Sequence, residues 1–487
     1  MTYRTRTLIK AALGLLFVTI LSLAVYFGVY KVKEGEARAD SEAREVLRFD
    51  QEKVIRLLLE KGGKRTIVER TGRDGKNLPV WKLVEPVKDD GDNTSINSLL
   101  GVVDRLESEQ VIAGKDREPL SVYGLDPPRG KIVLTLEGDQ SHTLHVGKKS
   151  AFDNRLYIQR AGDEEILLVK GYVENSLLKK TFDLRRKELV SFEKGLVRRL
   201  VLTSAGVKIA LEKEGETWNI TAPLDDRADK SEVDKILNTV LNLRATAFPL
   251  GEKLGLEVYG LQPPAVTLEV FIGPDLARSA VVLGRGQLKP NQGKTFARLQ
   301  PSGPVAEVRE YQLKNLQKTP FDLQAKAPLG FESKEVFKIK SASDQSLIVL
   351  EKEEVLPAGK GRQPRKTEVW SLVSPRAAKA KNHRVVSFLS GLSGLRAVRF
   401  VGDKQKADLG VFGLDKPVRT ITLYDREDRE LGVLKIGKST PEGIYVIGTA
   451  RPQVCLVDSK KVEHFPIDVK DLEADKQKKL DRTGFSP

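Results

Sequence analysis

WKLVEP, at Trp81–Pro86, returns as WNITAP at Trp218–Pro223 and as WSLVSP at Trp370–Pro375. These three stretches contain every tryptophan of the protein, and each tryptophan stands five residues before a proline. Because successive side chains of a strand alternate between its two faces, the tryptophan and the apolar residue two positions later share one face. Proline lacks the N–H group that a sheet ladder needs, so it ends the strand. The stretch therefore predicts three equivalent strands and an internal repeat.

An amphipathic helix is expected after each of these strands. Five apolar residues recur there, at a first position and three, four, seven and ten residues beyond it, which is one face of a helix. In every copy the first position lies fifteen residues after the tryptophan (96 − 81, 233 − 218, 385 − 370). The three sets are Ile96, Leu99, Leu100, Val103 and Leu106; Val233, Ile236, Leu237, Val240 and Leu243; and Val385, Phe388, Leu389, Leu392 and Leu395. The candidate N-caps are Asp92 or Asn93, Asp229, and Asn382.

A second signature follows the helix, 42, 41 and 42 residues after the tryptophans. It places an aromatic residue before a glycine and a leucine, at Tyr123-Gly124-Leu125, Tyr259-Gly260-Leu261 and Phe412-Gly413-Leu414. Glycine and the prolines beyond it predict a tight turn that the aromatic ring pins to the core. A strand meander is expected to close each unit, with a further glycine turn at Gly147, Gly284 and Gly437. The segments Phe182–Leu184 and Phe321–Leu323 end the first two units, and 465–467 is a looser third equivalent.

These features predict three copies of one module with a period of about 140–150 residues. Solenoid repeats span only about 20–50 residues, so each of these modules can hold its own core. The predicted fold class is α+β, with one N-terminal transmembrane helix followed by three tandem modules, each an antiparallel β meander with one amphipathic helix. The predicted segments are 1–10 (cytoplasmic), 11–30 (transmembrane helix), 31–50 (linker), 51–191, 192–331 and 332–472 (modules), and 473–487 (charged tail). An insertion at 354–367 is expected to be a mobile basic loop.

The N-terminal region has the length and composition of a membrane span. Residues 11–30 carry no charge, and about 20 residues of helix cross the ~30 Å hydrocarbon core of a bilayer. The basic residues before them, Arg4, Arg6 and Lys10, predict a cytoplasmic N-terminus. The alternative is a cleaved signal peptide, because Ala37-Arg38-Ala39 resembles a cleavage site. The apolar stretch exceeds the usual 7–15 residues of such a peptide, and charged residues precede Ala37, which favours an uncleaved anchor.

Composition narrows the range of partners. The chain has 487 residues and a formal net charge of +15, but Lys and Arg are interleaved with Asp and Glu. That pattern is typical of solvated surfaces, and we expect no nucleic-acid partner. Anionic lipid head groups or an acidic envelope polymer remain as partners, with Lys31, Lys33 and the 354–367 loop as the best candidates. Cys455 is the single cysteine, so neither an intramolecular disulfide nor a cysteine-based metal cluster is expected.

The sequence predicts no catalytic, cofactor-binding or metal site. Gly432–Ser439 matches the phosphate-loop pattern formally, but its inner residues are β-forming and no helix pattern follows, so we interpret it as a glycine hairpin turn. His142 and His145 stand three residues apart in a predicted strand, where they would point to opposite faces and away from a common metal. The second copy has Gln262 where the others have an aspartate, so this position does not indicate acid–base catalysis. No Gly-x-Ser-x-Gly elbow is present.

The N-terminal segment, the three tryptophan strands, the helices and the aromatic-Gly-Leu turns together resemble a bacterial domain-of-unknown-function family, numbered 4340. The resemblance covers most of residues 51–470. It implies an envelope protein of the kind associated with gliding-motility-type ABC transporters, with its modules facing the periplasm. It implies no catalytic residue. The third copy departs from the others at Lys381, where they have Asp92 and Asp229, and at Lys416.

We therefore predict a non-enzymatic, single-pass protein of the bacterial inner membrane, with most of the chain in the periplasm or otherwise outside the cytoplasm. Its expected function is that of an accessory or scaffold component of an ABC-transporter-type or other envelope complex, without a cofactor. The alternative is a glycan- or polyanion-binding envelope protein, and an envelope hydrolase is a third hypothesis. The structural repeat positions are Trp81, Trp218, Trp370, Pro86, Pro223, Pro375, Tyr123, Tyr259, Phe412, Gly124, Gly260, Gly413, Gly147, Gly284 and Gly437.

Overall fold

The computed structural model describes most of the chain from residue 44 onward. The described residues are 44–249, 254–286, 291–355, 367–403, 408–463, 465 and 468–474, together with Thr19, Ser22 and Tyr26. The chain divides into two compact units, of which the first runs to Lys208 and includes Lys235–Lys318. The second comprises Ile209–Asp234 and the chain from Thr319 onward. The boundary between the two units therefore falls within the second of the three predicted repeats.

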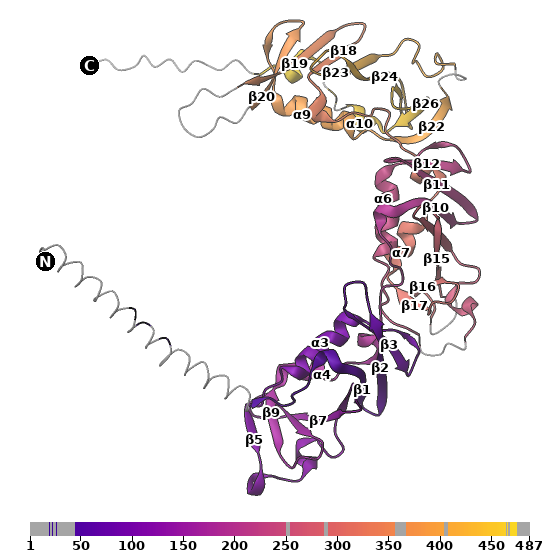
Figure 1. Ribbon diagram of the computed structural model, residues 1–487. Coiled ribbons are helices and arrows are strands. Elements are labelled where there is room, and N and C mark those ends of the chain that lie inside the picture. Colours follow the sequence, from indigo (N-terminus) through magenta and orange to yellow (C-terminus); the bar gives the residue numbers. More distant parts are fainter. Residues whose placement is uncertain are drawn as a thin grey trace, which may run out of the picture. The chain divides into compact units, whose positions relative to one another are not determined.

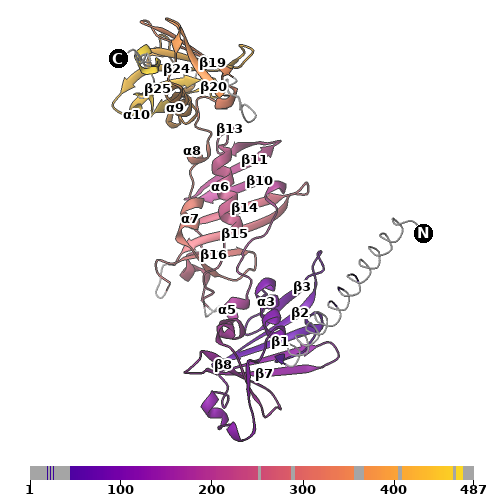
Figure 2. The same cartoon turned by 90° about the vertical axis from the view of Figure 1, so that its left-hand side faces the viewer.

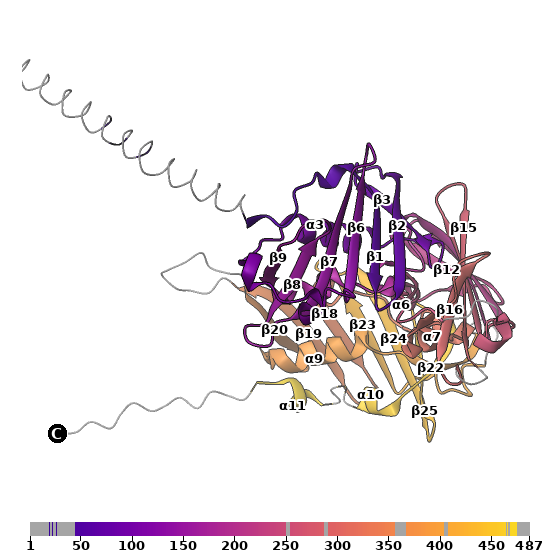
Figure 3. The ribbon, with the colours of Figure 1, turned by 90° about the horizontal axis from the view of Figure 1, so that it is seen from below.

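The described chain is mostly antiparallel β-sheet, arranged as three sheets (Figure 1). We call the parts of the chain that form them the first, second and third modules. In the first sheet, the strand order is β4 (Asp89–Asp90), β3 (Pro79–Glu85), β2 (Lys64–Arg73), β1 (Val54–Lys61), β6 (Gly130–Leu136), β7 (Ser141–Lys149), β8 (Arg155–Arg160), β9 (Ile166–Lys170) and β5 (Gln110–Ile112). Figure 3 shows these strands side by side, with the long helix of the module on one face. The strand that begins the module, β1, therefore lies inside the sheet between β2 and β6.

The other two sheets repeat this order. The second is β13 (Asp226–Arg227), β12 (Thr217–Ala222), β11 (Val207–Glu214), β10 (Val197–Ser204), β14 (Val266–Ile272), β15 (Ala277–Arg285), β16 (Thr295–Gln300) and β17 (Ala306–Val308) (Figure 2). The third is β21 (Ala378–Lys379), β20 (Thr367–Ser374), β19 (Leu347–Val355), β18 (Lys338–Ala342), β23 (Arg419–Tyr424), β24 (Glu430–Thr440), β25 (Gly443–Gly448), β26 (Gln453–Val457) and β22 (Ala397–Asp403). In the second module an isolated bridge between Ala247 and Glu307 replaces the outermost strand.

One twelve-residue helix per module lies where the apolar spacing predicts it. The three are α3 (Asn93–Asp104), α6 (Lys230–Leu241) and α9 (Asn382–Ser393). All fifteen residues of the predicted apolar faces are buried, none more than 4% exposed. Burying such a stripe against a sheet is the main source of stability for a helix of this length.

Two of the three N-caps were predicted correctly. The carboxylate of Asp92 accepts a hydrogen bond from the Ser95 N–H at 2.9 Å, and that of Asp229 accepts from the Ser231 N–H at 2.9 Å. The prediction of Asn382 was wrong, because α9 begins at this residue and Lys381 precedes it without a side-chain cap. The Asn382 side chain instead accepts a hydrogen bond from the Trp370 N–H at 2.8 Å. An amide that serves the neighbouring strand looks the same in the sequence as one that caps the helix.

Short helices end each module, and one of them corrects the predicted repeat. They are α4 (Glu174–Leu177), α5 (Thr181–Leu184), α7 (Glu310–Leu316), α8 (Pro320–Leu323), α10 (Ser459–Glu463) and α11 (Val469–Leu472). The residue that directly precedes the long helix of each module donates its backbone N–H to a leucine carbonyl at 2.7–2.8 Å. The pairs are Asp92 with Leu184, Asp229 with Leu323, and Lys381 with Leu472. Leu472 is therefore the third equivalent of Leu184, and the choice of 465–467 was wrong.

The predicted fold class also needs correction. The described chain is mostly antiparallel β-sheet, because each module combines eight or nine strands with one long helix. In the part of the chain that the structure describes, no helix is long and apolar enough to cross a membrane. The span predicted at 11–30 lies outside the described residues except for Thr19, Ser22 and Tyr26, and so do the cleavage-site alternative at 37–39 and residues 356–366 of the insertion.

The tryptophan strands lie next to the short edge strand of each sheet, and their tryptophans are buried. Trp81, Trp218 and Trp370 are 1%, 4% and 3% exposed, and their strands end one residue before the prolines, at bonds that are cis. The Trp81 indole N–H donates to the Asn97 side-chain oxygen at 2.9 Å, which satisfies its one polar group within the core. Trp81 and Trp370 each belong to the main hydrophobic cluster of their module.

The recurring glycines form close pairs between a turn and a strand. Gly124, Gly260 and Gly413 have φ angles of 64–67°, a left-handed conformation that favours glycine. We predicted that their partners Gly147, Gly284 and Gly437 form turns. This prediction was wrong, because the three glycines lie inside β7, β15 and β24. A β-carbon on these three would lie 2.4, 1.7 and 2.3 Å from the carbonyl oxygens of Tyr123, Gly260 and Phe412. Glycine is therefore required there for close backbone approach and not for chain reversal.

Cys455 provides a chemical probe of the third module. It lies in β26, is fully buried, and burial raises the pKa of its thiol to about 11, although Arg451 nearby acts in the opposite direction. The reactive thiolate is therefore almost absent at neutral pH. We expect maleimide at pH 8 to label Cys455 only as fast as the third module unfolds, with urea restoring full labelling. Rapid labelling of the native chain, followed by mass spectrometry, would contradict this burial.

Candidate functional site

A cluster of charged and aromatic side chains joins the first module to the second within the first compact unit. Arg185, just after α5, donates to the Asp89 carboxylate from Nε at 2.7 Å, and its guanidinium lies 3.5 Å from the ring centroid of Phe248. Phe182 contacts Phe248 with ring centroids 5.9 Å apart. The Arg185 and Asp89 side chains are only 9% and 15% exposed. We call this cluster the first junction.

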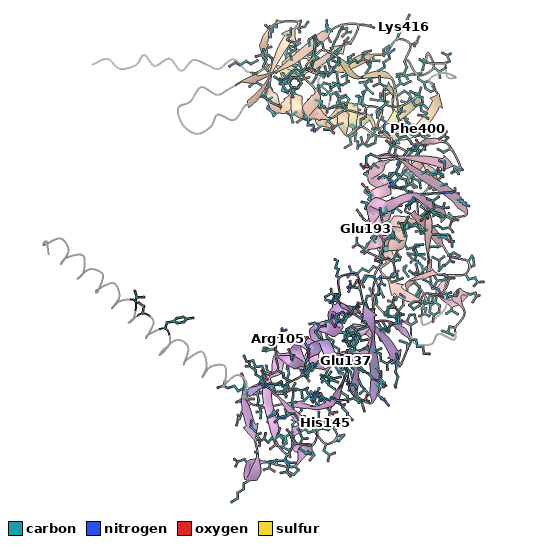
Figure 4. The ribbon with its side chains drawn as sticks, in the orientation of Figure 1. Arg105, Glu137, His145, Glu193, Phe400 and Lys416 are labelled. Atoms are coloured by element: carbon teal, nitrogen blue, oxygen red, sulfur yellow. The ribbon has the colours of Figure 1, made fainter. Side chains whose placement is uncertain are left out.

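A second junction of the same kind lies in the second compact unit. Arg451, just before β26, donates to the Asp226 carboxylate at 2.5 Å, and its guanidinium lies 4.5 Å from the ring centroid of Phe400 (labelled in Figure 4). Phe321 contacts Phe400 at 5.5 Å between centroids, and Gln324 Nε2 donates to Asp226 at 2.6 Å. The Arg451 and Asp226 side chains are 3% and 10% exposed.

In both junctions a guanidinium lies between an aspartate and a phenylalanine at equivalent positions of the repeat. The arginine that carries it stands at a different position of the repeat in each junction. Both aspartates lie eight residues after a tryptophan (89 − 81, 226 − 218). Gln324 occupies the position of Arg185, three residues after the equivalent phenylalanine. Ile444 pairs with Val457 in the third module and Thr295 pairs with Val308 in the second, so Val457 and Val308 hold equivalent positions. Counting back the same number of residues (457 − 451, 308 − 302) makes Ser302 the second module's equivalent of Arg451. The bridging arginine thus comes from the earlier module in the first junction and from the later module in the second.

A lysine completes each junction in the same way. Lys187 Nζ donates to the Asp183 carbonyl at 3.0 Å and lies 5.3 Å from the Phe182 ring centroid. Lys326 Nζ donates to the Asp322 carbonyl at 3.1 Å and lies 4.7 Å from the Phe321 ring centroid. An ammonium over an aromatic face is stabilised by the ring quadrupole, more strongly where water is partly excluded.

In the first junction the lysine also binds the N-cap of α3. Burial acts to raise the pKa of the Asp92 carboxyl, but hydrogen bonds from the Ser95 N–H and from Lys187 outweigh it, so the pKa falls below its usual 3.8. A carboxyl with a lowered folded-state pKa adds stability above the unfolded-state pKa, and this stability is lost as the pH falls through the folded-state value. The Asp92 contribution should therefore be complete near neutral pH and disappear below about pH 4.

Replacing Asp92 with asparagine should flatten this pH dependence. The Asp92→Asn chain is expected to be less stable than the wild type at pH 7, with the difference narrowing as the pH falls below the usual carboxyl pKa of 3.8. Urea unfolding measured above and below this pH, with the exposed Asp116→Asn as control, checks the result. A difference that stays constant with pH would show that the carboxylate charge plays no part.

The third module ends without the junction residues. Ala378 stands where the other modules have Asp89 and Asp226 (378 − 370), and Glu473, directly after α11, takes the position of Arg185. Glu473 forms an ion pair with Arg376 of the same module. This end is therefore built differently from the two junctions.

Three depressions lie on the described surface. One of about 580 Å³ surrounds the start of α3 beside the first junction, with Asp90, Asp92, Glu188, Arg186 and Arg244 among its charged residues. One of about 540 Å³ in the third module mixes Lys338, Lys352 and Arg426 with Glu351, Asp425 and Asp428. The largest, about 780 Å³, lies between α6 and α7, and its lining residues include no carboxylate. It is the one depression of the three with charge of a single sign.

The motifs weighed for chemistry are structural in this chain. Gly432–Ser439 lies entirely within β24, so the formal phosphate-loop match is neither a loop nor the hairpin turn that we predicted. His142 and His145 lie on β7 opposite Leu134 and Lys131 of β6 (His145 is labelled in Figure 4). No group of three metal-ligating side chains occurs among the described residues.

The structure separates the predicted repeat positions into two groups within each module. The tryptophans are buried on the strand that precedes the long helix, and Trp81 and Trp370 belong to the main hydrophobic clusters. The prolines follow the ends of these strands and are exposed. The aromatic residues of the turns form smaller clusters instead, with edge-to-face ring contacts of 4.9–5.0 Å for Tyr123–Tyr157, Tyr259–Phe296 and Phe412–Tyr445. Neither group brings a reactive side chain to the surface.

The junction residues and the α6–α7 depression were not found from the sequence. The aspartates carried a usable signal, because their spacing from tryptophan recurs in two copies. Arg451 carried none, since it pairs with a residue 225 positions away and has no counterpart in the other copies.

Comparisons with known proteins agree with the repeat. A model of the Domain of unknown function (DUF4340) matches residues 81–264, 218–369 and 370–486. Each matched stretch begins at one of the three tryptophans, and together they span most of the chain. A comparison with the curated proteins finds no relative. The three matches, their common starting point and the three sheets of one strand order place this chain in the DUF4340 family.

Proposed function

We propose that this protein is a non-catalytic scaffold or accessory component of an envelope assembly outside the cytoplasm. The observation that carries the proposal is the junction. In both compact units a buried guanidinium bridges an aspartate of one module and a phenylalanine of the next, although different arginines supply it.

The physical cost of such a cluster indicates what it is for. A buried ion pair often stabilises no more than an apolar contact of similar size, but it specifies one geometry, because breaking it leaves an unpaired charge. Aromatic rings alone would hold neighbouring modules together in several orientations. In the second junction Arg451 of the third module donates to Asp226 of the second, and this directional, charge-assisted hydrogen bond selects one orientation. In the first junction the pair of Arg185 with Asp89 lies within the first module and fixes the guanidinium that Phe248 of the second module contacts. A protein that uses charged pairs in this way presents neighbouring modules in a set arrangement, which supports binding to partners by more than one module.

The partner class that we propose rests on the resemblance described from the sequence. The resemblance to envelope proteins of gliding-motility-type ABC transporter systems supports transporter subunits as partners, with the modules on the outer side of the membrane. No residue of the junctions is positioned to transform a substrate, and the proposal assigns none to catalysis.

In-cell crosslinking with mass spectrometry tests the proposal on the full chain. We expect reproducible links from at least two modules to subunits of one transporter. In Arg185→Gln cells, links from the first module should fall relative to those from the third, because the first junction has lost its geometry. Arg278→Gln serves as the matched control. It also removes an arginine from an ion pair, with Glu269, but the Arg278 side chain is 51% exposed. Links to wall material alone, or an equal fall at every module, would contradict the scaffold role.

A further inference from the structure

The depression between α6 and α7 in the second module is lined by amides and cations. Three of its residues, Lys235, Asn238 and Thr239, lie on one face of α6, and Asn242 directly follows the last residue of this helix at helical spacing. α7 supplies Tyr311, Gln312 and Asn315, and the remaining lining residues are Phe182, Lys187, Arg244, Ala245, Thr246, Arg309 and Lys318. All lie in the first compact unit. Figure 2 shows the two helices on the same side of the sheet. We call this site the amide cleft.

The other two modules close the same helix face instead of opening it. Counted from the tryptophan, these four positions correspond to Ser98, Gly101, Val102 and Arg105 in the first module and to Ser387, Ser390, Gly391 and Gly394 in the third. In the first module α3 packs against α4. In the third, the Phe465 ring lies 3.0 Å from where a β-carbon on Gly391 would be, and 5.2 Å from the Phe388 ring between centroids. Small residues permit this packing at two of these positions, Ser98 and Gly101 in the first module and Ser387 and Ser390 in the third, where the second module has Lys235 and Asn238.

Hydrogen bonds hold the amides of the cleft in place. Gln312, which is 2% exposed, donates from Nε2 to the Asn242 carbonyl at 2.8 Å. Asn242 Nδ2 donates to the Asn238 carbonyl at 2.8 Å, and Asn315 Nδ2 lies 3.5 Å from the Thr239 hydroxyl. Gln312 Oε1 also accepts from the Arg309 N–H at 3.2 Å, and Asn238 Oδ1 accepts from Lys194 Nζ at 3.2 Å. A primary amide has two N–H groups and two lone pairs, so these bonds orient each amide and leave capacity for a ligand. Polar groups oriented beforehand bind with a smaller loss of conformational entropy.

The charges that line the cleft are all positive. Lys187 is fully engaged, with bonds to the Asp92 carboxylate and to the carbonyls of Asp183 and Arg185 at 3.0–3.1 Å. Arg244 pairs with Glu188. Lys235, Arg309 and Lys318 also line the cleft, so each of its five charged residues is a cation. A concave site lined by one sign of charge concentrates ligands of the opposite sign.

We propose that the amide cleft binds an acidic carbohydrate, a short sugar chain that carries carboxylate groups. Its volume of about 780 Å³ falls in the range of about 300–1,000 Å³ that is usual for ligand sites. Amides that donate and accept together suit a ligand with many hydroxyls, and the half-exposed ring of Tyr311 offers an apolar face for a sugar ring. Lysine and arginine suit its carboxylates. This function goes beyond the scaffold role and needs no protein partner.

Isothermal titration of the full chain with defined oligosaccharides tests the proposal. The probes are a trimer of galacturonic acid, a trimer of glucuronic acid and, as the neutral comparison, a trimer of galactose. We expect saturable binding of at least one acidic trimer, at least tenfold tighter than that of the neutral one. Lys235→Ser and Asn238→Ser introduce the residues of the third module and should each weaken binding about tenfold or more, about 1.4 kcal/mol. Because those residues are already tolerated on the equivalent helix, folding should be preserved, and circular dichroism checks it.

Lys230→Ser is the matched control, since it removes the same charge from the same helix, outside the cleft, where Lys230 pairs with Glu216. Binding should be unchanged in this variant. An equal loss in the Lys230 and Lys235 variants would show diffuse attraction to the net charge and overturn the proposal. So would equal affinity for the neutral trimer, or no saturable binding of either acidic trimer. Because no transporter is present, failure here would leave the scaffold role untouched.

Discussion

Arg451→Gln should destabilise the second compact unit by about 3–5 kcal/mol, the usual cost of removing one partner of a buried ion pair. The Asp226 carboxylate, 10% exposed, would keep its charge and lose its guanidinium partner. The substitution also removes the hydrogen bond to the Ala325 carbonyl and the contact with Phe400. The rate of Cys455 labelling in urea measures the effect within the same unit.

A second substitution tests whether the geometry of the junction is transferable. Gln324→Arg places an arginine at the position that Arg185 occupies in the first junction, so in the Arg451→Gln background it should recover about 2 kcal/mol or more. Arg399→Gln is the control, because Arg399 and Glu442 form an exposed pair at 58% and 68% and should contribute at most about 1 kcal/mol. If the exposed pair costs as much as Arg451, or if Gln324→Arg adds nothing, the two junctions are not equivalent.

Gly284→Ala should destabilise the second module by about 3 kcal/mol, at the upper end of what overpacking costs. The new β-carbon would lie 1.7 Å from the Gly260 carbonyl oxygen and 2.4 Å from its carbon, and neither backbone group can move without displacing the turn. Native-state hydrogen exchange of peptides from β14, β15 and β16 measures the loss of protection.

Gly195→Ala is the matched control for this substitution. A β-carbon there meets nothing within 4 Å, and its φ angle is not in the left-handed region. Surface changes of this kind are usually within about 0.5 kcal/mol. Similar exchange in both variants would mean that the Gly260–Gly284 contact is looser than the structure shows.

The sequence predicted what depends on local periodicity. The helices α3, α6 and α9 and the tryptophan strands were located because burial imposes a spacing that one chain segment carries by itself. The order of strands was less accessible, since β1 pairs with β6 across the whole helix and turn. Gly147, Gly284 and Gly437 were assigned to turns because a glycine required by a close backbone approach has no distinguishing neighbour in the sequence.

The candidate sites show the same limit. Asp226 and Arg451 meet only through the packing of two modules, and no pattern in one copy indicates the other. The amide cleft, by contrast, was present in the sequence. Lys235 and Asn238 differ from the small residues at the equivalent positions of both other copies, but these positions lie outside the apolar face that identifies the helix.

The two sources of the junction arginine constrain the order in which these modules diverged. Modules that arise by duplication begin identical, so one ancestral arrangement preceded both junctions. If the arginine at the Arg185 position were lost before one appeared at the Arg451 position, the junction aspartate would be left buried and unpaired. The permitted route is an intermediate that carried both arginines, after which either one became dispensable. The third module, with Ala378 in place of the aspartate, shows the other outcome, in which losing the carboxylate removed the need for any arginine.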